Sequence, residues 1–163
     1  MSPRHLLVDR SARRVRGAVD GVAKLATRVA PPLMRLALAL PFLRSGLTRW
    51  DGFLVLSPGT SYLFEDQFKL HVLGAEYGLP VPGQLAWLTA CAEIALPVLL
   101  LVGLGTRFAA LALLTMTAVI QLVFPDGWAN FHLYWAALAL GITTTGPGAL
   151  SIDRWIDRAV ARP

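Results

Sequence analysis

Two charged side chains stand inside long apolar runs of the sequence, where a charge is costly. Glu93 lies in the run Trp87–Val102, and Arg44 lies in the run Pro32–Trp50. Runs of this kind are close to the ~17–25 residues that a membrane-spanning helix needs. A charge at such a depth is normally paired, neutralised or turned towards a cavity, and it marks a functional site by default. Together, the two groups can orient a carbonyl or relay a proton.

The depths of the two residues are compatible with an ion pair. At ~1.5 Å per residue, Arg44 lies about 4–5 Å outward of the middle of its run, and Glu93 lies within about 3 Å of the middle of 85–104. We therefore predict an Arg44–Glu93 ion pair inside a helix bundle. The alternative is an Arg44 that extends outward beside a protonated Glu93. We interpret Arg35 and Arg49, near the two ends of the first run, as headgroup residues.

Further polar residues fall in the outer halves of the later apolar runs. Gln121 belongs to the third run, and Asn130, His132 and Tyr134 belong to the fourth. His132 can serve as a second proton group, although a histidine so placed is more often a buried residue with satisfied hydrogen bonds. Trp87 is either an interface residue or part of the wall of a ligand site. The catalytic candidates are Glu93, Arg44 and His132, and the binding candidates are Gln121, Asn130, Trp87 and Tyr134.

Other classes of site find little support in the sequence. No second histidine lies three or four residues from His132, so we expect no metal site. Walker, GxGxxG and GxSxG motifs are absent. Cys91 is the single cysteine, so redox chemistry would need a bound carrier or a partner. Pro97 has no N–H to donate to the carbonyl of Glu93. That acceptor is then available to a ligand, or the proline only kinks the helix for packing.

Four apolar runs must supply the helices that position these residues. Hydrophobic residues make up 55% of the 163 residues, above the share of about 45–50% that is usual in soluble domains even with glycine included. Short turns at 103–107 and 125–127 make consecutive helices antiparallel. The sequence predicts an all-α fold, a transmembrane four-helix bundle, with spans at Pro32–Trp50, Leu85–Leu104, Phe108–Phe124 and Trp128–Thr145.

The cations of this chain lie mainly on one side of the expected membrane. The net charge is +5, and outside the spans the opposite side would hold only Lys69. Such an asymmetry follows the positive-inside rule when both termini are cytoplasmic. The basic balance therefore indicates membrane orientation and not nucleic-acid binding. The cations of the inner side are Arg4, Arg10, Arg13, Arg14, Arg16, Lys24, Arg28, Arg107, Arg154, Arg158 and Arg162.

Three segments outside the spans have the pattern of amphipathic helices on the membrane surface. The first is the basic stretch 1–30, for which a cationic tail that only sets topology is the alternative. The second lies in the first outer loop, about 63–75, with Thr60 or Ser61 as its cap. The third is 151–163, capped by Ser151. We expect the domain 31–150 between the two terminal segments to begin its first span at Pro31 and Pro32.

Several stretches of this chain together resemble the DoxX family of small four-helix membrane proteins, over roughly residues 33 to 155. The resemblance implies a role in membrane redox, linked to quinones or thiols through the DoxD-type subunit of thiosulfate:quinone oxidoreductase. It also implies a location in the bacterial plasma membrane. The matching stretches are Arg35–Asp51, Tyr77–Pro82, the second run with Glu93, Gly103–Arg107, the start of the fourth run with His132, and Gly146–Asp153.

Three functions are compatible with these features. The leading one is a quinone-linked oxidoreductase subunit that binds a quinone-like or other lipid-soluble carrier in an outer-half polar cavity and receives electrons from a partner subunit or a soluble substrate. The second is a non-catalytic anchor that assembles soluble oxidoreductases on its basic inner face. The third is a small-molecule permease, which four helices without an internal repeat fit poorly unless the protein forms a homo-oligomer.

Overall fold

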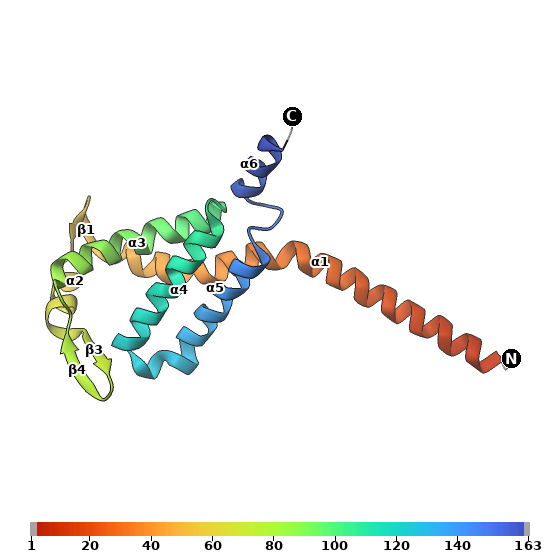
Figure 1. The fold of residues 1–163 in the computed structure, drawn as a ribbon, viewed down its shortest axis with the longest axis horizontal. Coiled ribbons are helices and arrows are strands. Elements are labelled where there is room, and N and C mark those ends of the chain that lie inside the picture. Colours follow the sequence, from red (N-terminus) through yellow and green to blue (C-terminus); the bar gives the residue numbers. More distant parts are fainter. Residues whose placement is uncertain (1–2, 162–163) are drawn as a thin grey trace.

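The computed structural model describes residues 3–161, and its long helices form one bundle from which the N-terminal part of the first helix projects (Figure 1). Helix α1 packs against α3 and α5, and α4 packs against the same two helices. The four therefore close into a ring. Their bounds are Pro3–Leu47 for α1, Pro82–Val102 for α3, Thr106–Val123 for α4 and Leu133–Thr145 for α5.

The centre of the ring is filled by a small set of fully buried apolar side chains. Larger residues alternate with alanines, which let the helix backbones approach closely, as helices in a membrane do when van der Waals packing holds them together. The set comprises Leu38, Ala39, Phe42, Leu100, Ala109, Ala110, Leu113, Ala139 and Ile142.

Two helices, α3 and α4, are long and apolar enough to cross a membrane, as judged by their length and composition. They correspond to the second and third expected spans. The fourth expected span is helical throughout, but it begins as a π-helix, η3 (Trp128–His132), before continuing as α5. That the first and fourth runs also cross the membrane stays a prediction, as does the division of the chain at residues 30 and 150.

Helix α1 does not begin where the sequence predicts. It runs without a break through Pro31 and Pro32, so the expectation that a helix starts there is wrong. The fixed φ of proline is itself helical. The two carbonyls that lose their donors, those of Thr27 and Arg28, belong to exposed residues where water can solvate them.

The first outer loop also differs from expectation, because only residues 58–67 are helical and a hairpin lies on either side of them. The predicted amphipathic helix over 63–75 is wrong. Its second half is a hairpin whose two-residue turn, Leu73 and Gly74, has φ values of 52° and 82°, the left-handed pair that tight hairpins require. Ser57, and not Thr60 or Ser61, caps the short helix through its side chain. The elements are β1 (Trp50–Gly52), β2 (Val55–Leu56), α2 (Pro58–Tyr62), the π-helix η1 (Leu63–Gln67), β3 (Lys69–Val72) and β4 (Ala75–Gly78), the strands pairing β1 with β2 and β3 with β4.

Helix α6 (Ile152–Val160) begins as predicted, with the Ser151 hydroxyl accepting a hydrogen bond from the backbone N–H of Arg154. The carboxylate of Asp153 accepts the N–H groups of Gly105 and Thr106 at 2.7 and 2.9 Å. It thereby caps α4 and ties α6 to the turn between α3 and α4.

Arg35 belongs to the same end of the bundle and is buried, so its assignment to the headgroups is wrong. Its Nη2 group donates a hydrogen bond to the carbonyl of Leu150, just before α6. The arginine therefore holds the connection between α5 and α6 against α1. No local pattern in the sequence indicates this contact.

Candidate functional site

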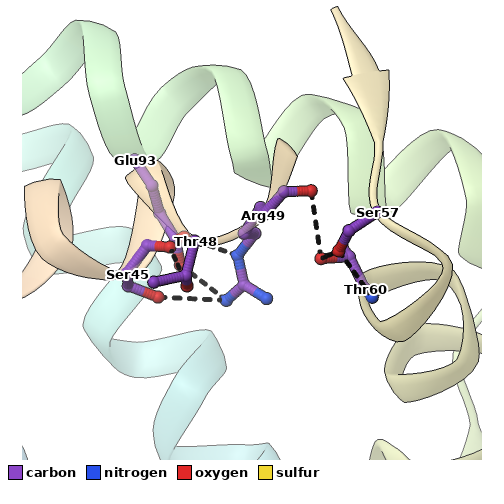
Figure 2. A network of polar contacts seen from close by, with 6 residues as sticks. All are labelled: Ser45, Thr48, Arg49, Ser57, Thr60 and Glu93. Atoms are coloured by element: carbon purple, nitrogen blue, oxygen red, sulfur yellow. Dashed lines mark hydrogen bonds and ion pairs between the residues drawn. The ribbon is translucent and has the colours of Figure 1, made fainter. Parts of the chain in front are cut away.

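Glu93 is buried, with 2% of its surface exposed, and its carboxylate forms a two-point ion pair with Arg49 (Figure 2). Arg49 Nε lies 2.5 Å from Glu93 Oε2, and Arg49 Nη2 lies 2.9 Å from Glu93 Oε1. Two parallel, charge-assisted hydrogen bonds of this kind are stronger and more directional than neutral ones. The pair joins the end of α1 to the middle of α3.

The prediction that Arg44 is the partner of Glu93 is therefore wrong. Arg44 is exposed on α1. Depth along the helix does not determine the face, and with 3.6 residues per turn a residue five positions later points elsewhere. Helix α1 ends at Leu47, and a turn then brings the side chain of Arg49 back towards α3.

Arg49 is held in place at both its backbone and its side chain. Its carbonyl accepts hydrogen bonds from the Ser57 N–H at 2.9 Å and the Thr60 hydroxyl at 3.2 Å (Figure 2). Its Nη2 group also donates to the Ser45 hydroxyl at 3.3 Å. The ring of Phe64 lies 5.3 Å from the guanidinium carbon, within the range of a cation–π contact. The loop after α1 thus fixes the guanidinium in one orientation.

Helices α1 and α3 lie very close together beside this pair, where Gly46 faces Glu93. A Cβ atom at position 46 would lie 2.9 Å from the Cβ, carbonyl carbon and carbonyl oxygen of Glu93, closer than real Cβ atoms come. The carbonyl that Pro97 leaves without a donor therefore lies against Gly46. This close approach favours the packing role of Pro97 over a role in holding a ligand.

A cavity of about 310 Å³ opens beside the ion pair, between α1, α3, α4, α5 and the loop element η1. Its polar lining consists of Ser45, Arg49, Thr89, Glu93 and His132, and the remaining lining is apolar. The aromatic part of that lining comprises Phe42, Phe64, Phe68, Phe124 and Trp135. An apolar, aromatic cavity with a few convergent polar groups is typical of small-molecule sites.

His132 forms the second polar point of the cavity, with 3% of its surface exposed. Its Nδ1 lies 2.6 Å from Gln121 Oε1, while Gln121 Nε2 donates to the carbonyl of Pro125 at 2.9 Å. Because the amide nitrogen is already donating to a carbonyl, the amide oxygen must accept the proton of Nδ1. A neutral His132 then keeps the lone pair on Nε2 as an acceptor. Gly127 packs against the ring and leaves no room for a side chain.

The remaining sequence candidates do not reach the cavity. Gln121 positions His132 and is not part of the lining. Asn130 is exposed, and Trp87 and Tyr134 are 45% and 60% exposed. None of these three residues lines this cavity. They share an apolar run with true lining residues but stand on other faces of their helices.

The assignment of Arg49 to the headgroups is wrong, because its guanidinium pairs with the buried Glu93. Sequence reasoning also missed most of the aromatic lining. Phe64 and Phe68 are four residues apart, and Trp135 follows His132 by three, so helical spacing alone could have placed each pair together. No comparable signal marks Arg49, because its orientation depends on where α1 ends. Among the described residues, no group of three or more histidines, cysteines, aspartates or glutamates is arranged to hold a metal ion.

The hydrogen bonds leave one donor and one acceptor unpaired on residues that line the cavity. In the described part of the chain, Arg49 Nη1 has no hydrogen-bond partner, whereas Nε and Nη2 are engaged (Figure 2). His132 contributes the lone pair of Nε2. The carboxylate of Glu93 neutralises the guanidinium, so a ligand need carry no charge. The arrangement suits an uncharged, ring-shaped molecule with oxygen atoms that accept or donate hydrogen bonds.

Comparison with known proteins gives one match. The family model DoxX matches residues 30–126, a stretch that includes Arg49 and Glu93 and ends before His132. No curated protein and no solved structure matches the chain.

Proposed function

The chain belongs to the DoxX family of membrane proteins, and we propose that it serves a membrane redox system by binding a quinone-like carrier in the cavity beside Arg49 and Glu93. The observation that supports this proposal most strongly is the free donor of Arg49 in an aromatic cavity whose charges already cancel. A quinone ring can stack on aromatic side chains, and its carbonyl oxygen can accept a hydrogen bond from Nη1.

Proton transfer gives the ion pair and His132 a further purpose. A quinone gains protons as it gains electrons, so a site for it needs groups that can supply or accept them. His132 would exchange a proton through Nε2, while Gln121 holds its other nitrogen. Arg49 would orient the carbonyl, and Glu93 would keep the guanidinium in place. Electrons would come from a partner, since Cys91 is the single cysteine of the chain.

The proposed setting is a plasma membrane crossed by α1, α3, α4 and α5, with the cavity in the outer half. Apart from Arg44 and Arg49, the loop end of the bundle carries one cation, Lys69, whereas the α6 end carries Arg28, Arg107, Arg154 and Arg158. This difference in charge supports an orientation with both termini on the cytoplasmic side.

Quinone binding to the purified protein tests the proposal. A short-tailed quinone should bind the wild type, and Arg49→Gln should lower its affinity by about tenfold or more, the effect of removing a hydrogen bond from a charged donor. Arg44→Gln is the matched control, because it removes an exposed arginine near the end of α1, five residues before Arg49, and it should bind like the wild type. Equal affinities for the wild type and Arg49→Gln would overturn the proposed site.

A second function is supported by a different feature, the projecting part of α1. Val15, Val19, Val22 and Leu25 are exposed there together with basic side chains, a surface that can anchor a partner protein. Under this function, deleting residues 1–28 would abolish the pull-down of a soluble oxidoreductase, and the protein would bind no quinone.

A further inference from the structure

A second hollow lies at the other end of the bundle, roughly 30 Å along α1 from the ion pair at ~1.5 Å per residue. It has a volume of about 1010 Å³ and lies between α1, the connection that follows α5, and α6. Figure 1 shows this region where α6 stands beside the point at which α1 leaves the bundle. The proposed redox function makes no use of it.

Arginines dominate the charge of this hollow. Arg28 from α1 and Arg154 and Arg158 from α6 line it, and Asp157 is the single acidic residue among the lining residues. Three positive charges and one negative charge leave a net charge of +2. In the part of the chain that the structure describes, none of the three guanidinium groups makes a hydrogen bond or ion pair. Their forked donors are suited to phosphate oxygens.

The position of α6 is fixed by contacts that do not involve the three arginines. Asp153 is hydrogen-bonded to the backbone of Gly105 and Thr106. Gly148 lies so close to α1 that a Cβ there would be 2.6 Å from the Cβ of Pro31. The arginines of α6 are therefore held opposite Arg28 by the fold itself and need no ligand to bring them together.

The surroundings of the hollow are apolar and exposed. Leu150, Trp155 and Val160 near or on α6 are each more than two-thirds exposed, as is Val22 on α1. Exposed apolar residues beside arginines are typical of elements that lie at the boundary between lipid tails and headgroups. Basic pockets at the cytoplasmic end of spanning helices bind the headgroups of anionic lipids.

We propose that this hollow binds the phosphate headgroup of an anionic phospholipid, with Arg28, Arg154 and Arg158 as the phosphate ligands. The net charge of +2 matches an anionic headgroup and gives no advantage to a zwitterionic one. The lipid would join α6 to the membrane and restrict the motion of α1 near Arg28, where the helix leaves the bundle. The proposal does not depend on quinone binding at the other end.

Native mass spectrometry of the detergent-solubilised full chain tests this site, with phosphatidylglycerol and phosphatidylcholine as probes. Phosphatidylglycerol should be retained at least about fivefold more than phosphatidylcholine. The preference should disappear in the double variant Arg28→Gln/Arg158→Gln and persist in Arg28→Lys/Arg158→Lys, which keeps the charges. Arg16→Gln, on an exposed part of α1 outside the hollow, is the matched control and should behave like the wild type.

Two results would overturn the proposal. Equal retention of the two lipids by the wild type would show that the hollow does not select charge, and undiminished retention of phosphatidylglycerol by the glutamine double variant would place the lipid elsewhere. A large excess of inorganic phosphate separates the two sources of phosphate. Persistence of the lipid adduct supports a headgroup site, and its complete displacement would assign the arginines to a free anion instead.

Discussion

At one end of the bundle Arg49 donates two hydrogen bonds to a single carboxylate, and at the other end Arg35 and Asp153 lie near each other but bond to backbone groups. The first pair borders a cavity of about 310 Å³. In the second pair, Arg35 joins α1 to the connection between α5 and α6, and Asp153 joins α6 to the start of α4. Charges at least partly removed from solvent thus serve two purposes here. A directly neutralised pair lines a cavity, and charges bonded to the backbone join elements.

The most damaging change at the cavity end should be Glu93→Gln, because it leaves the Arg49 guanidinium buried without its counter-ion. Removing one partner of a buried pair costs about 3 kcal/mol or more. The protein should unfold at a clearly lower temperature in detergent, and Arg49→Met/Glu93→Leu should recover much of the loss. A melting temperature of Glu93→Gln equal to that of the wild type would show that the pair contributes nothing to stability.

Gly46→Ala should have the next largest effect, since its Cβ would meet the Glu93 backbone at 2.9 Å. Overpacking of this kind costs about 1–3 kcal/mol, and the shift of α1 from α3 should also weaken quinone binding. Gly141→Ala is the control, because its Cβ would meet only Met34 Sδ at 3.4 Å. Thermal unfolding and quinone titration of both variants check the prediction, which fails if the two variants are equally stable.

The stability of the α6 end of the bundle should depend on pH. Partial burial favours the protonated form of Asp153, but hydrogen bonds from the backbone of Thr106 and Gly105, with the charge of Arg35, outweigh it and hold its pKa below the usual value. A lowered folded-state pKa means that the stabilisation is fully present above the unfolded pKa of ~3.9 and is lost as pH falls through the folded value.

We therefore expect Asp153→Ala to lose about 1 kcal/mol at neutral pH, the typical contribution of a helix cap. The difference from the wild type should shrink as the pH falls below ~3.9 towards the folded-state pKa. Unfolding curves of both proteins over that pH range provide the measurement. A difference that stays constant down to the acid limit would mean that the ionised carboxylate is not what stabilises this end.

The smallest effects should come from Trp87→Phe and Tyr134→Phe. Both side chains are largely exposed and stand outside the cavity lining. Quinone affinity should stay within about twofold of the wild type in both variants, which is close to the limit of such a titration. A tenfold loss of quinone affinity in either variant would mean that the residue contacts the quinone and that the binding site is not the cavity described above.

The sequence predicted which polar groups are buried better than it predicted their partners. Glu93 and His132 are buried, as expected of polar groups in apolar runs, and the Ser151 cap of α6 is correct. The partner of Glu93 was missed by five residues, because the identity of the inward face depends on the end of α1 at Leu47. Periodicity alone carries no information on that end.

The outer loop shows a second limit of sequence reasoning. Its apolar spacing fits a helix as well as it fits a hairpin, and the choice depends on the left-handed turn at Leu73 and Gly74. A leucine at a positive φ is uncommon, so no propensity predicts it. Phe64 and Phe68 nevertheless reach the cavity from this loop, so two of the five aromatic lining residues come from a segment whose path the sequence did not predict.

Photolabelling with an azido-quinone would locate the carrier directly in the wild-type protein. If the cavity beside Arg49 and Glu93 is its site, the label should fall on peptides containing Phe64, Phe68 or Trp135, and excess unlabelled quinone should prevent the labelling. Label confined to the lipid-facing surfaces of α3 and α4, unaffected by competitor, would contradict the account.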